Sequence, residues 1–279
     1  MLIHQMKKAC ASLSSRLRAR TYLRGHPIRT DFPLPDYANL WSQLLLQPGI
    51  ATEDYVVDRQ RFSHWIRHAN YPLSAYVVNR AEKRLEHHIS AELLALPPGS
   101  LLIDVASAHS PFPAIMRRGG YRVIAQDLAF KPGLHGDRLG GDASRLELPN
   151  SCADGMTLHC SFEHFESSSD TRFIIEAARV LKSGGRVVIL PLYLHQEYIN
   201  MTDPLYSRVP VDFDEGASVV GAFGLANRYG RHYAVPAFLA RVVEPAMQHG
   251  LRVTVVRVKN SDAISTKVYL RFALVLTKR

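Results

Sequence analysis

The sequence predicts a doubly wound α/β domain with a mostly parallel sheet, and three observations predict it. Apolar runs that each finish in a polar residue recur between residues 101 and 193. Stretches with helical spacing separate several of these runs. The polar run ends, among them Asp104, Asp127 and Ser161, would then meet at one edge of the sheet. In an open α/β sheet, ligands bind beyond the carboxyl ends of the strands, so this edge is where we expect a site.

The apolar runs give the expected strands in order. The sheet begins with the runs 101–104, 121–127, 156–161 and 186–192, with Gly140-Gly141-Asp142-Ala143 marking a further strand end. Residues 252–259 and 267–277 then predict two strands that close the sheet as a hairpin.

The expected helices lie between these strands. Residues 79–96 carry apolar side chains every four residues from Ala81 to Leu93, and Pro97-Pro98-Gly99 ends the pattern. A second helix starts at Pro111 and stops at Gly119-Gly120, with prolines at its start and glycine past its end. Residues 170–182 and 236–249 predict two more.

Residues 31–75 are broken by four prolines and hold a dense aromatic set. One interpretation is that these rings pack a helical cap against the sheet. The other is that some of them line an acceptor pocket. The set is Phe32, Tyr37, Trp41, Tyr55, Phe62, Trp65 and Tyr71.

The net charge of +9 is concentrated at the N-terminus. Residues 1–30 hold seven Lys and Arg and no acid, whereas the other 249 residues hold 27 basic and 25 acidic groups. Three interpretations of residues 1–30 stay open: a solvated basic tail, a surface that contacts an anionic membrane or polymer, and a mitochondrial transit peptide. The nearly neutral remainder argues against a nucleic-acid partner, which would need a basic track.

Composition indicates a soluble globular protein, with 47% hydrophobic and 21% charged residues. No apolar run reaches the ~18 residues of a membrane span. The three cysteines have no CxxC spacing, which favours a reducing compartment, and we expect a cytoplasmic protein. Cys160 is interpreted as a small buried residue of a central strand.

Four motifs resemble class I S-adenosylmethionine-dependent methyltransferases, and the type 11 methyltransferase domain in particular. They are Ile103-Asp104, Asp127, Gly141-Asp142-Ala143 and the 179–185 segment RVLKSGG. The resemblance covers roughly residues 80 to 195. It implies a Rossmann-like, mostly parallel seven-stranded sheet whose last strand is antiparallel. We therefore expect a basic segment and helical cap over 1–78, and a methyltransferase-like domain over 79–279 with an insertion at 195–235.

One motif departs from the resembled family. That family has glycines in the pattern D-x-G-x-G after the first acid, whereas this chain has Ala106 and Ala108. Alanine disfavours the positive φ angles that glycine permits. We expect either that the loop binds the cofactor with ordinary backbone angles, or that the site has been lost.

The resemblance implies roles for the strand-end residues with S-adenosylmethionine as cofactor. Asp127 would accept hydrogen bonds from the ribose hydroxyls, although capping of the next loop is an alternative. Asp142 would face the adenine amino group, although a simple turn is an alternative. Asp104 would help to orient the methionine amino group. The full implied cofactor set is Asp104, Ala106, Ser107, Ala108, Asp127, Leu128, Asp142, Ala143, Cys160 and Ser161.

Glu163 and His164 follow the fourth strand and resemble a Glu-His pair found there in type 11 enzymes. An imidazole is suited to general-base work near neutral pH, so we predict these two as catalytic residues. A structural pair that shapes the loop is the alternative. No second ligand at firm spacing accompanies them, and we expect no metal.

Residues 195–235 form a long polar stretch, which in a compact domain is usually functional. We predict that it contacts the acceptor through His195, Tyr198, Arg231 and Tyr233.

The sequence as a whole favours an S-adenosylmethionine-dependent methyltransferase that acts on an oxygen or nitrogen of a small molecule or saccharide. A first alternative is a non-catalytic module with the same fold, motivated by the missing glycines. A second is an NAD-type dinucleotide-binding protein, which the absence of G-x-G-x-x-G after Asp104 disfavours.

Overall fold

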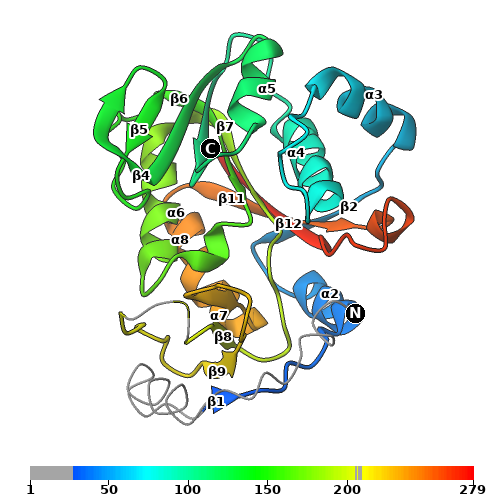
Figure 1. Cartoon of the computed structure of the whole chain (residues 1–279). Helices are drawn as coiled ribbons and strands as arrows, with labels where there is room; N and C mark the ends of the chain where they lie inside the picture. Colours follow the sequence, from blue (N-terminus) through cyan, green and yellow to red (C-terminus); the bar gives the residue numbers. More distant parts are fainter. Residues whose placement is uncertain (1–27, 205, 207–208) are drawn as a thin grey trace.

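The protein is described by a computed structural model that covers residues 28–204, 206 and 209–279. Within these residues the chain forms one large and one small β-sheet with helices packed around them (Figure 1). The expectations for residues 1–27 lie outside the described residues.

The large sheet has eight strands among the described residues, in the order β2-β11-β12-β7-β6-β3-β4-β5. β12 runs antiparallel to both of its neighbours, and the other adjacent pairs are parallel. The strands are β2 (Ile50–Tyr55), β3 (Leu101–Val105), β4 (Arg122–His135), β5 (Arg138–Gly140), β6 (Ala153–His159), β7 (Leu181–Leu190), β11 (Leu251–Val258) and β12 (Phe272–Lys278).

Seven of these strands confirm the predicted sheet with its antiparallel last strand. β2 is the exception, because residues 31–75 were expected to hold only irregular chain and helices. Ile50–Tyr55 has little apolar alternation, and only its ends and Thr52 are partly buried. It forms a strand because β11 offers it a free edge, along which Val253 to Val258 pair with it in parallel.

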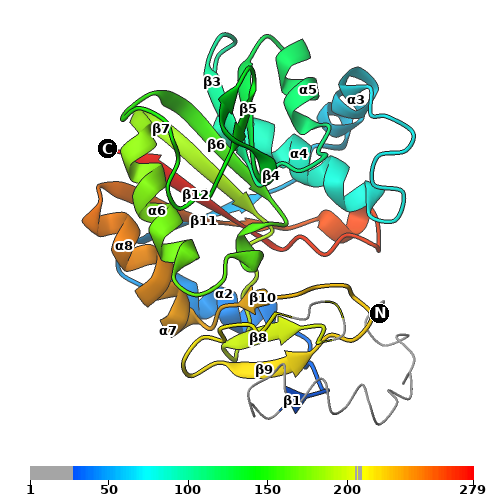
Figure 2. The ribbon, with the colours of Figure 1, turned by 60° about the vertical axis from the view of Figure 1, so that its left-hand side comes forward.

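Two layers of helices cover the large sheet (Figure 2). One face packs against α3 (Arg59–Ala69), α4 (Arg80–Leu94) and α5 (Phe112–Arg118). The other packs against α2 (Tyr37–Leu45), α6 (Ser169–Val180) and the 235–248 stretch. That stretch consists of α7 (Val235–Phe238), the π-helical turn η3 (Leu239–Val243) and α8 (Glu244–Gln248).

Strand residues alternate between these two layers, as the pleat requires. Val187 and Ile189 of β7 join the core beneath α6, while Val188 and Leu190 join the core beneath α4. The four helices predicted from the 79–96, 111–119, 170–182 and 236–249 patterns are confirmed within one or two residues of their expected limits.

No helix stands between β4 and β5. After Asp127 the chain extends to His135, turns, and pairs a second time with β5, so that His135 lies opposite Arg138. Gly140 permits this close return, because a Cβ there would lie 2.0 Å from the Lys131 carbonyl oxygen.

The insertion is ordered into strands, where the sequence predicted irregular chain. β8 (Ile199–Thr202), β9 (Ser218–Gly221) and β10 (Gly230–His232) form the small sheet, and β1 (Ile28–Arg29) adds to its edge. In Figures 1 and 2 this sheet lies at the opposite end of the molecule from α3 and α5. Its strands are too short for a clear alternation of apolar and polar residues. They form because β8 pairs with both β9 and β10.

None of the described helices is both long enough and apolar enough to cross a membrane.

Candidate active site

The predicted cofactor residues lie in or directly after the strands β3, β4, β5 and β6. These strands are parallel neighbours, with Ile103 opposite both Ile124 of β4 and Met156 of β6. The loops after them therefore start side by side, as expected from the order of the motifs.

The loop after β3 has a left-handed backbone at both of its alanines. Ala106 has φ 51° and Ala108 has φ 45°. The expectation that alanine would force ordinary backbone angles is therefore wrong. The loop has glycine-like angles, because contacts with the neighbouring strand hold it. Ala106 N–H donates to the Gln126 side chain (3.2 Å) and Ser107 N–H to the Gln126 carbonyl (2.8 Å).

We predict that Ala106→Gly and Ala108→Gly each raise the free energy of unfolding by about 0.5–1 kcal/mol. Each substitution removes a Cβ from a left-handed position, which costs roughly 1–2 kcal/mol for a residue with a side chain, although glycine also gains entropy in the unfolded chain. Urea unfolding measures the effect. Ala114→Gly, within α5, is the control and should destabilise instead, because glycine disfavours helix.

The carboxylate of Asp104 is buried, and both of its oxygens accept hydrogen bonds from within the protein. It is 1% exposed and accepts hydrogen bonds from Ser107 Oγ (2.6 Å) and Thr157 Oγ1 (2.8 Å). His159 Nδ1 lies 3.3 Å from its Oδ1. Asp104 thus fixes the loop to β6, and its predicted contact with a methionine amino group stays a prediction.

Asp127 binds the same loop from within β4, where the first stretch of pairing with β5 ends opposite Gly140. Its Oδ2 accepts from Ala108 N–H and its Oδ1 from Ala129 N–H, both at 2.8 Å. A carboxylate has about four acceptor positions, so two remain for hydroxyl donors. Loop capping and ribose binding, which the sequence left as alternatives, are therefore compatible.

Gln126 is a residue that the sequence analysis missed. It is 1% exposed, accepts from Ala106 N–H, and donates to the Gly141 carbonyl at 2.5 Å. It therefore ties the loop after β3 to the loop after β5. The sequence feature that could have indicated it is an amide side chain in a mostly apolar run, directly before Asp127.

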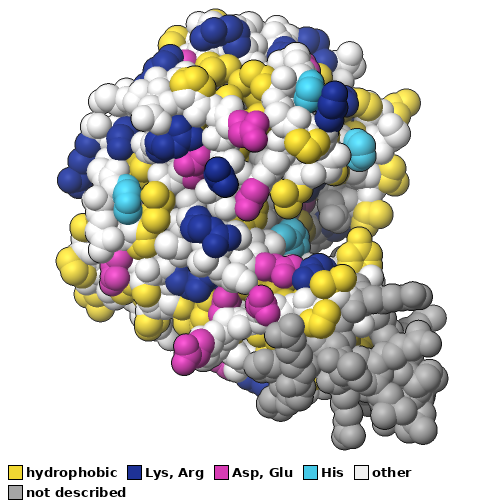
Figure 3. Space-filling model, turned by 90° about the vertical axis from the view of Figure 1, so that its left-hand side faces the viewer, with side chains coloured by type: hydrophobic (Ala, Val, Ile, Leu, Met, Phe, Trp, Pro, Cys, Tyr) yellow, Lys and Arg dark blue, Asp and Glu magenta, His cyan; other side chains and the backbone are white. Residues whose placement is uncertain are grey.

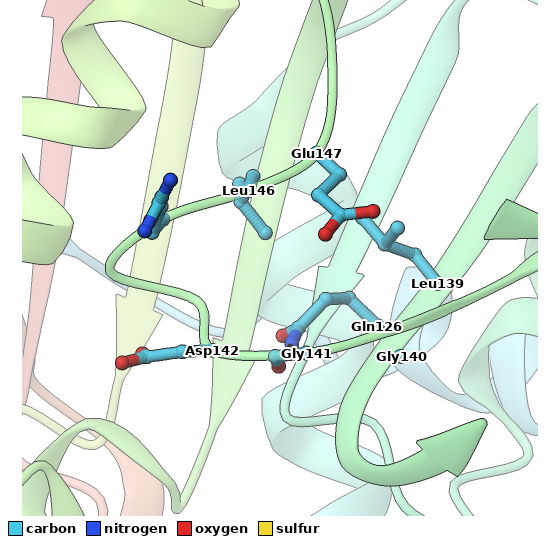
Figure 4. A pocket seen from close by; sticks show the side chains of 8 residues that line it. Gln126, Leu139, Gly140, Gly141, Asp142, Leu146 and Glu147 are labelled. Atoms are coloured by element: carbon cyan, nitrogen blue, oxygen red, sulfur yellow. Dashed lines mark hydrogen bonds between the residues drawn. The ribbon is translucent and has the colours of Figure 1, made fainter. Parts of the chain in front are cut away.

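A cavity of ≈ 420 Å³ lies beside the β5 end, and Gln126, Gly141 and Asp142 line it (Figure 4). The Asp142 carboxylate points away from Leu139 and Glu147 (Figure 4). Its Oδ1 accepts from Ser144 N–H at 2.8 Å, which is the turn that the sequence offered as an alternative to adenine contact.

Two neighbours in the predicted cofactor set contribute little side-chain chemistry. Leu128 is 76% exposed and lines neither this cavity nor the one described next. Ala143 is 5% exposed and packs in the core. Their backbone contacts with a cofactor stay predictions.

A second cavity, of ≈ 680 Å³, lies over the loop after β3. This volume is within the range of small-molecule sites, about 300–1,000 Å³. Asp104, Ala106, Ser107 and Ala108 line it from the loop, and Cys160 lines it from the end of β6.

The cavity also has lining residues that were not selected from the sequence, among them Tyr76, Lys83 and His159. Lys83 Nζ is bonded to Glu86 Oε2 (2.9 Å) and to the His159 carbonyl. The signal was a polar stripe on α4, Glu82, Lys83, Glu86, His87 and Ser90, all buried against the sheet. The apolar periodicity from Ala81 to Leu93 predicted only the other buried face of this helix.

The segment after β6 places Glu163 inside the protein and His164 at its surface. Both residues lie in the 3₁₀ turn η2 (Phe162–His164). Glu163 is 8% exposed, its Oε2 has no hydrogen-bond partner, and burial raises its pKa despite His164 beside it. His164 Nε2 lies 3.6 Å from Glu163 Oε1, while its Nδ1 contacts the Tyr229 carbonyl at 2.5 Å. Ser161 is buried and its hydroxyl is unpartnered.

Three of the four predicted acceptor residues are buried in structural contacts, which corrects that prediction. Arg231 is 0% exposed and pairs with Asp170 and Asp214. Tyr233 is 1% exposed and donates to Asp170. His195 is 0% exposed, with its Nε2 on the Pro33 carbonyl (3.1 Å). Fully buried and partnered groups have no surface left for an acceptor. Tyr198 is partly buried with an unpartnered hydroxyl, and its role stays a prediction.

No group of three His, Cys, Asp or Glu side chains suited to a metal ion occurs in residues 28–204, 206 and 209–279. On the face drawn in Figure 3, Lys and Arg side chains are interspersed with acidic ones.

Comparison with known proteins assigns the part of the chain that carries this edge to a family. Residues 103–189 match the family model described as a methyltransferase domain. The chain contains a class I methyltransferase domain. The matched residues run from β3 to β7 and include the strand-end residues Asp104, Asp127 and Asp142. S-adenosylmethionine is the cofactor of this class of domain.

A curated relative is the S-adenosyl-L-methionine-dependent Diels-Alderase iliD of Neonectria sp. (strain DH2), 27% identical over 160 residues. The match covers 55% of this chain and 58% of that protein, so the chain spans somewhat over half the length of this relative.

Among solved structures, the methyltransferase domain is similar to two bacterial proteins. One is the 1,6-didemethyltoxoflavin-N1-methyltransferase of Burkholderia thailandensis, at 15% identity and TM-score 0.45, over 89% of this chain and 93% of that chain. The other is an S-adenosylmethionine-dependent methyltransferase of Mesorhizobium loti, at 16% identity and TM-score 0.44, over 68% and 96%.

Proposed function

We propose that the protein transfers a methyl group from S-adenosylmethionine to an oxygen or nitrogen of a small molecule or saccharide. The observation that carries the proposal is the loop after β3. It has left-handed backbone at Ala106 and Ala108, and Asp127, in the neighbouring strand, accepts from its Ala108 N–H. The missing glycines motivated the non-catalytic alternative, and the left-handed backbone at both alanines supports cofactor binding over it.

The residues present fit the cofactor. Asp127 retains acceptor positions for two hydroxyl groups, and Ala106, Ser107 and Ala108 of the loop line the ≈ 680 Å³ cavity. When bound, S-adenosylmethionine supplies a methyl group on an activated sulfonium. The protein then has to align the acceptor and take its proton.

Glu163 and His164 are the proposed proton-accepting pair. The unpartnered Oε2 of Glu163 is a buried acceptor, and the adjacent imidazole lies 3.6 Å from its other oxygen. A proton taken from the acceptor by Glu163 can pass to His164, whose side chain is 46% exposed and reaches solvent.

We predict that Asp127→Ala weakens binding of S-adenosylhomocysteine by several-fold to a hundredfold. The substitution removes charge-assisted hydrogen bonds worth about 1.5–3 kcal/mol each. Isothermal titration calorimetry measures the change. Asp137→Ala is the matched control, because Asp137 forms a half-exposed pair with Arg117 and should leave affinity unchanged. No binding by the unaltered protein at millimolar ligand would contradict the proposal, and NAD in the same titration tests the dinucleotide alternative.

A second candidate is a pericyclic reaction in which the cofactor is bound but not consumed. The similarity to the S-adenosyl-L-methionine-dependent Diels-Alderase favours it. Product mass separates the two functions. Methyl transfer adds one methyl group in place of a hydrogen and releases S-adenosylhomocysteine, whereas a cycloaddition within one molecule leaves its mass and the cofactor unchanged.

The partners and the location of the protein are in part proposals and in part predictions. A small-molecule or saccharide acceptor is part of the proposal, and a cytoplasmic location stays a prediction. Attachment of residues 1–30 to an anionic surface also stays a prediction, because residues 1–27 lie outside the described part of the chain.

A further inference from the structure

A buried cluster of acids, phenols and a thiol adjoins the cavity at Cys160. The Cys160 thiol, which lines the cavity, lies 3.0 Å from Glu86 Oε1 and 3.4 Å from the Tyr269 hydroxyl. The Tyr193 hydroxyl lies 4.0 Å from the same sulfur. These groups come from α4 and from the segments after β6, after β7 and before β12, so only the tertiary structure brings them together.

The cluster holds three carboxyl groups and one ammonium group. Glu82, Glu86 and Glu163 are 1%, 0% and 8% exposed. Lys83 is bonded to Glu86, and no Lys or Arg of the described residues forms an ion pair with Glu82 or Glu163. Burial, with Glu86 beside it, raises the pKa of Glu82 to about 8.

Two of these acids have oxygens that accept no hydrogen bond in the structure. They are Oε1 of Glu82 and Oε2 of Glu163. A buried polar atom without a partner costs roughly 1–3 kcal/mol. A ligand that donates an N–H or O–H to such an oxygen would recover that cost.

Aromatic rings form the apolar part of the cluster. The Tyr193 ring lies 4.9 Å from the His232 ring and 6.4 Å from the Tyr269 ring, nearly parallel to the latter. Burial lowers the pKa of His232 to about 3, so its ring is uncharged at neutral pH. Flat rings beside carboxyl groups suit a planar ligand that carries a donor.

We propose that this cluster is the acceptor subsite, and that it selects planar, neutral or cationic compounds with an N–H or O–H and rejects anions. The inference rests on the proposed function and narrows it. An anionic acceptor would place its charge, unpaired, among three buried carboxyl groups, because Lys83 is already paired with Glu86. A phenol or heteroaromatic N–H brings a donor for Glu163 and a flat face for Tyr193 and Tyr269.

The test uses three probes of one shape on the full chain saturated with S-adenosylhomocysteine. They are 2-naphthol, which has a donor, 2-methoxynaphthalene, which has none, and 2-naphthoate, which is an anion. Saturation-transfer NMR titrations give the dissociation constants. We expect 2-naphthol to bind at least about tenfold more tightly than either of the others, the effect of one hydrogen bond to a charged or strongly polar acceptor.

Two variants test whether Glu163 and Glu82 cause the preference for 2-naphthol. Glu163→Gln and Glu82→Gln each remove an acid but keep its shape, and at least one should reduce the preference for 2-naphthol over 2-naphthoate severalfold. Glu244→Gln, on the exposed surface of α8, should leave the preference unchanged. Retained S-adenosylhomocysteine affinity shows that a variant is folded.

Naphthoate binding as tight as that of 2-naphthol, or a preference that survives both variants, would overturn the subsite. The proposed function fails by a different result, the absence of S-adenosylhomocysteine binding. In that case the same naphthalene series on the free protein still decides the subsite.

Discussion

Replacing Arg231 by methionine is expected to lower the free energy of unfolding by about 3–5 kcal/mol, the cost of removing one member of a buried ion pair. Arg231 is fully buried and donates to both oxygens of Asp214 at 2.7 and 2.8 Å. Its Nη1 also lies 2.9 Å from Asp170, which is 0% exposed. Methionine fills a similar volume but leaves both carboxylates with less compensating charge.

The same guanidinium joins the small sheet to the segment after β6. It donates to the Phe165 carbonyl (2.7 Å) and the Ser167 carbonyl (2.9 Å), while Arg228 pairs with Glu166 at 2.6 Å. The insertion is thus bonded to the chain that carries Glu163 and His164. We therefore expect Arg231→Met to reduce turnover as well, through a loosened η2 turn.

Guanidinium chloride unfolding and thermal unfolding measure the effect. A loss of this size should lower Tm by roughly 6–20 °C for a domain of this length. Arg252→Met is the matched control, because Arg252 is exposed on β11 and should change stability by no more than about 0.5 kcal/mol. Unchanged stability with a raised acceptor KM would contradict the structural role and restore the acceptor role predicted from the sequence.

Glu163→Gln is expected to reduce turnover by about 10²–10⁴ while leaving cofactor affinity nearly unchanged, as for loss of a general base. Glutamine keeps the shape of the side chain and cannot take a proton. His164→Asn should have a smaller effect if the imidazole only passes the proton on. It should have an equal effect if both groups act as one unit.

Transfer of a labelled methyl group measures turnover, with the acceptor that reacts fastest among a panel of phenols and heteroaromatic amines. Calorimetry with S-adenosylhomocysteine measures cofactor affinity on the same preparations. Glu197→Gln is the control, because this acid pairs with Arg29 at the half-exposed edge of the insertion. A fall in stability, cofactor affinity and turnover together would show that Glu163 only shapes the loop.

Local pattern was sufficient for the elements of the methyltransferase domain and for the edge that carries its site. The four-residue spacing through Leu85 and Ile89 predicted α4, and the apolar runs before Asp104 and Asp127 predicted β3 and β4. Such patterns succeed because each element buries a continuous face of its own.

The pattern failed where an element depends on a distant partner. Ile50–Tyr55 is a strand because β11 has a free edge, and β8 to β10 pair with one another across the insertion. Arg231, Tyr233 and His195 of the insertion were interpreted as acceptor contacts. They are instead buried against Asp170, Asp214 and the Pro33 carbonyl. A charged side chain in a loop looks the same in the sequence whether it contacts a ligand or forms a buried ion pair.

The sequence by itself determined the fold class, seven of the eight described strands of the large sheet and the edge of the sheet that carries Asp104 and Asp127. Only the tertiary structure decided the backbone of the loop after β3. Alanine disfavours φ near +50°, so no local rule predicts it at Ala106 and Ala108, and contacts with Gln126 and Asp127 supply the free energy that holds it. The burial of Arg231 was decided in the same way, by the two aspartates that fold against it from 17 and 61 positions away along the chain.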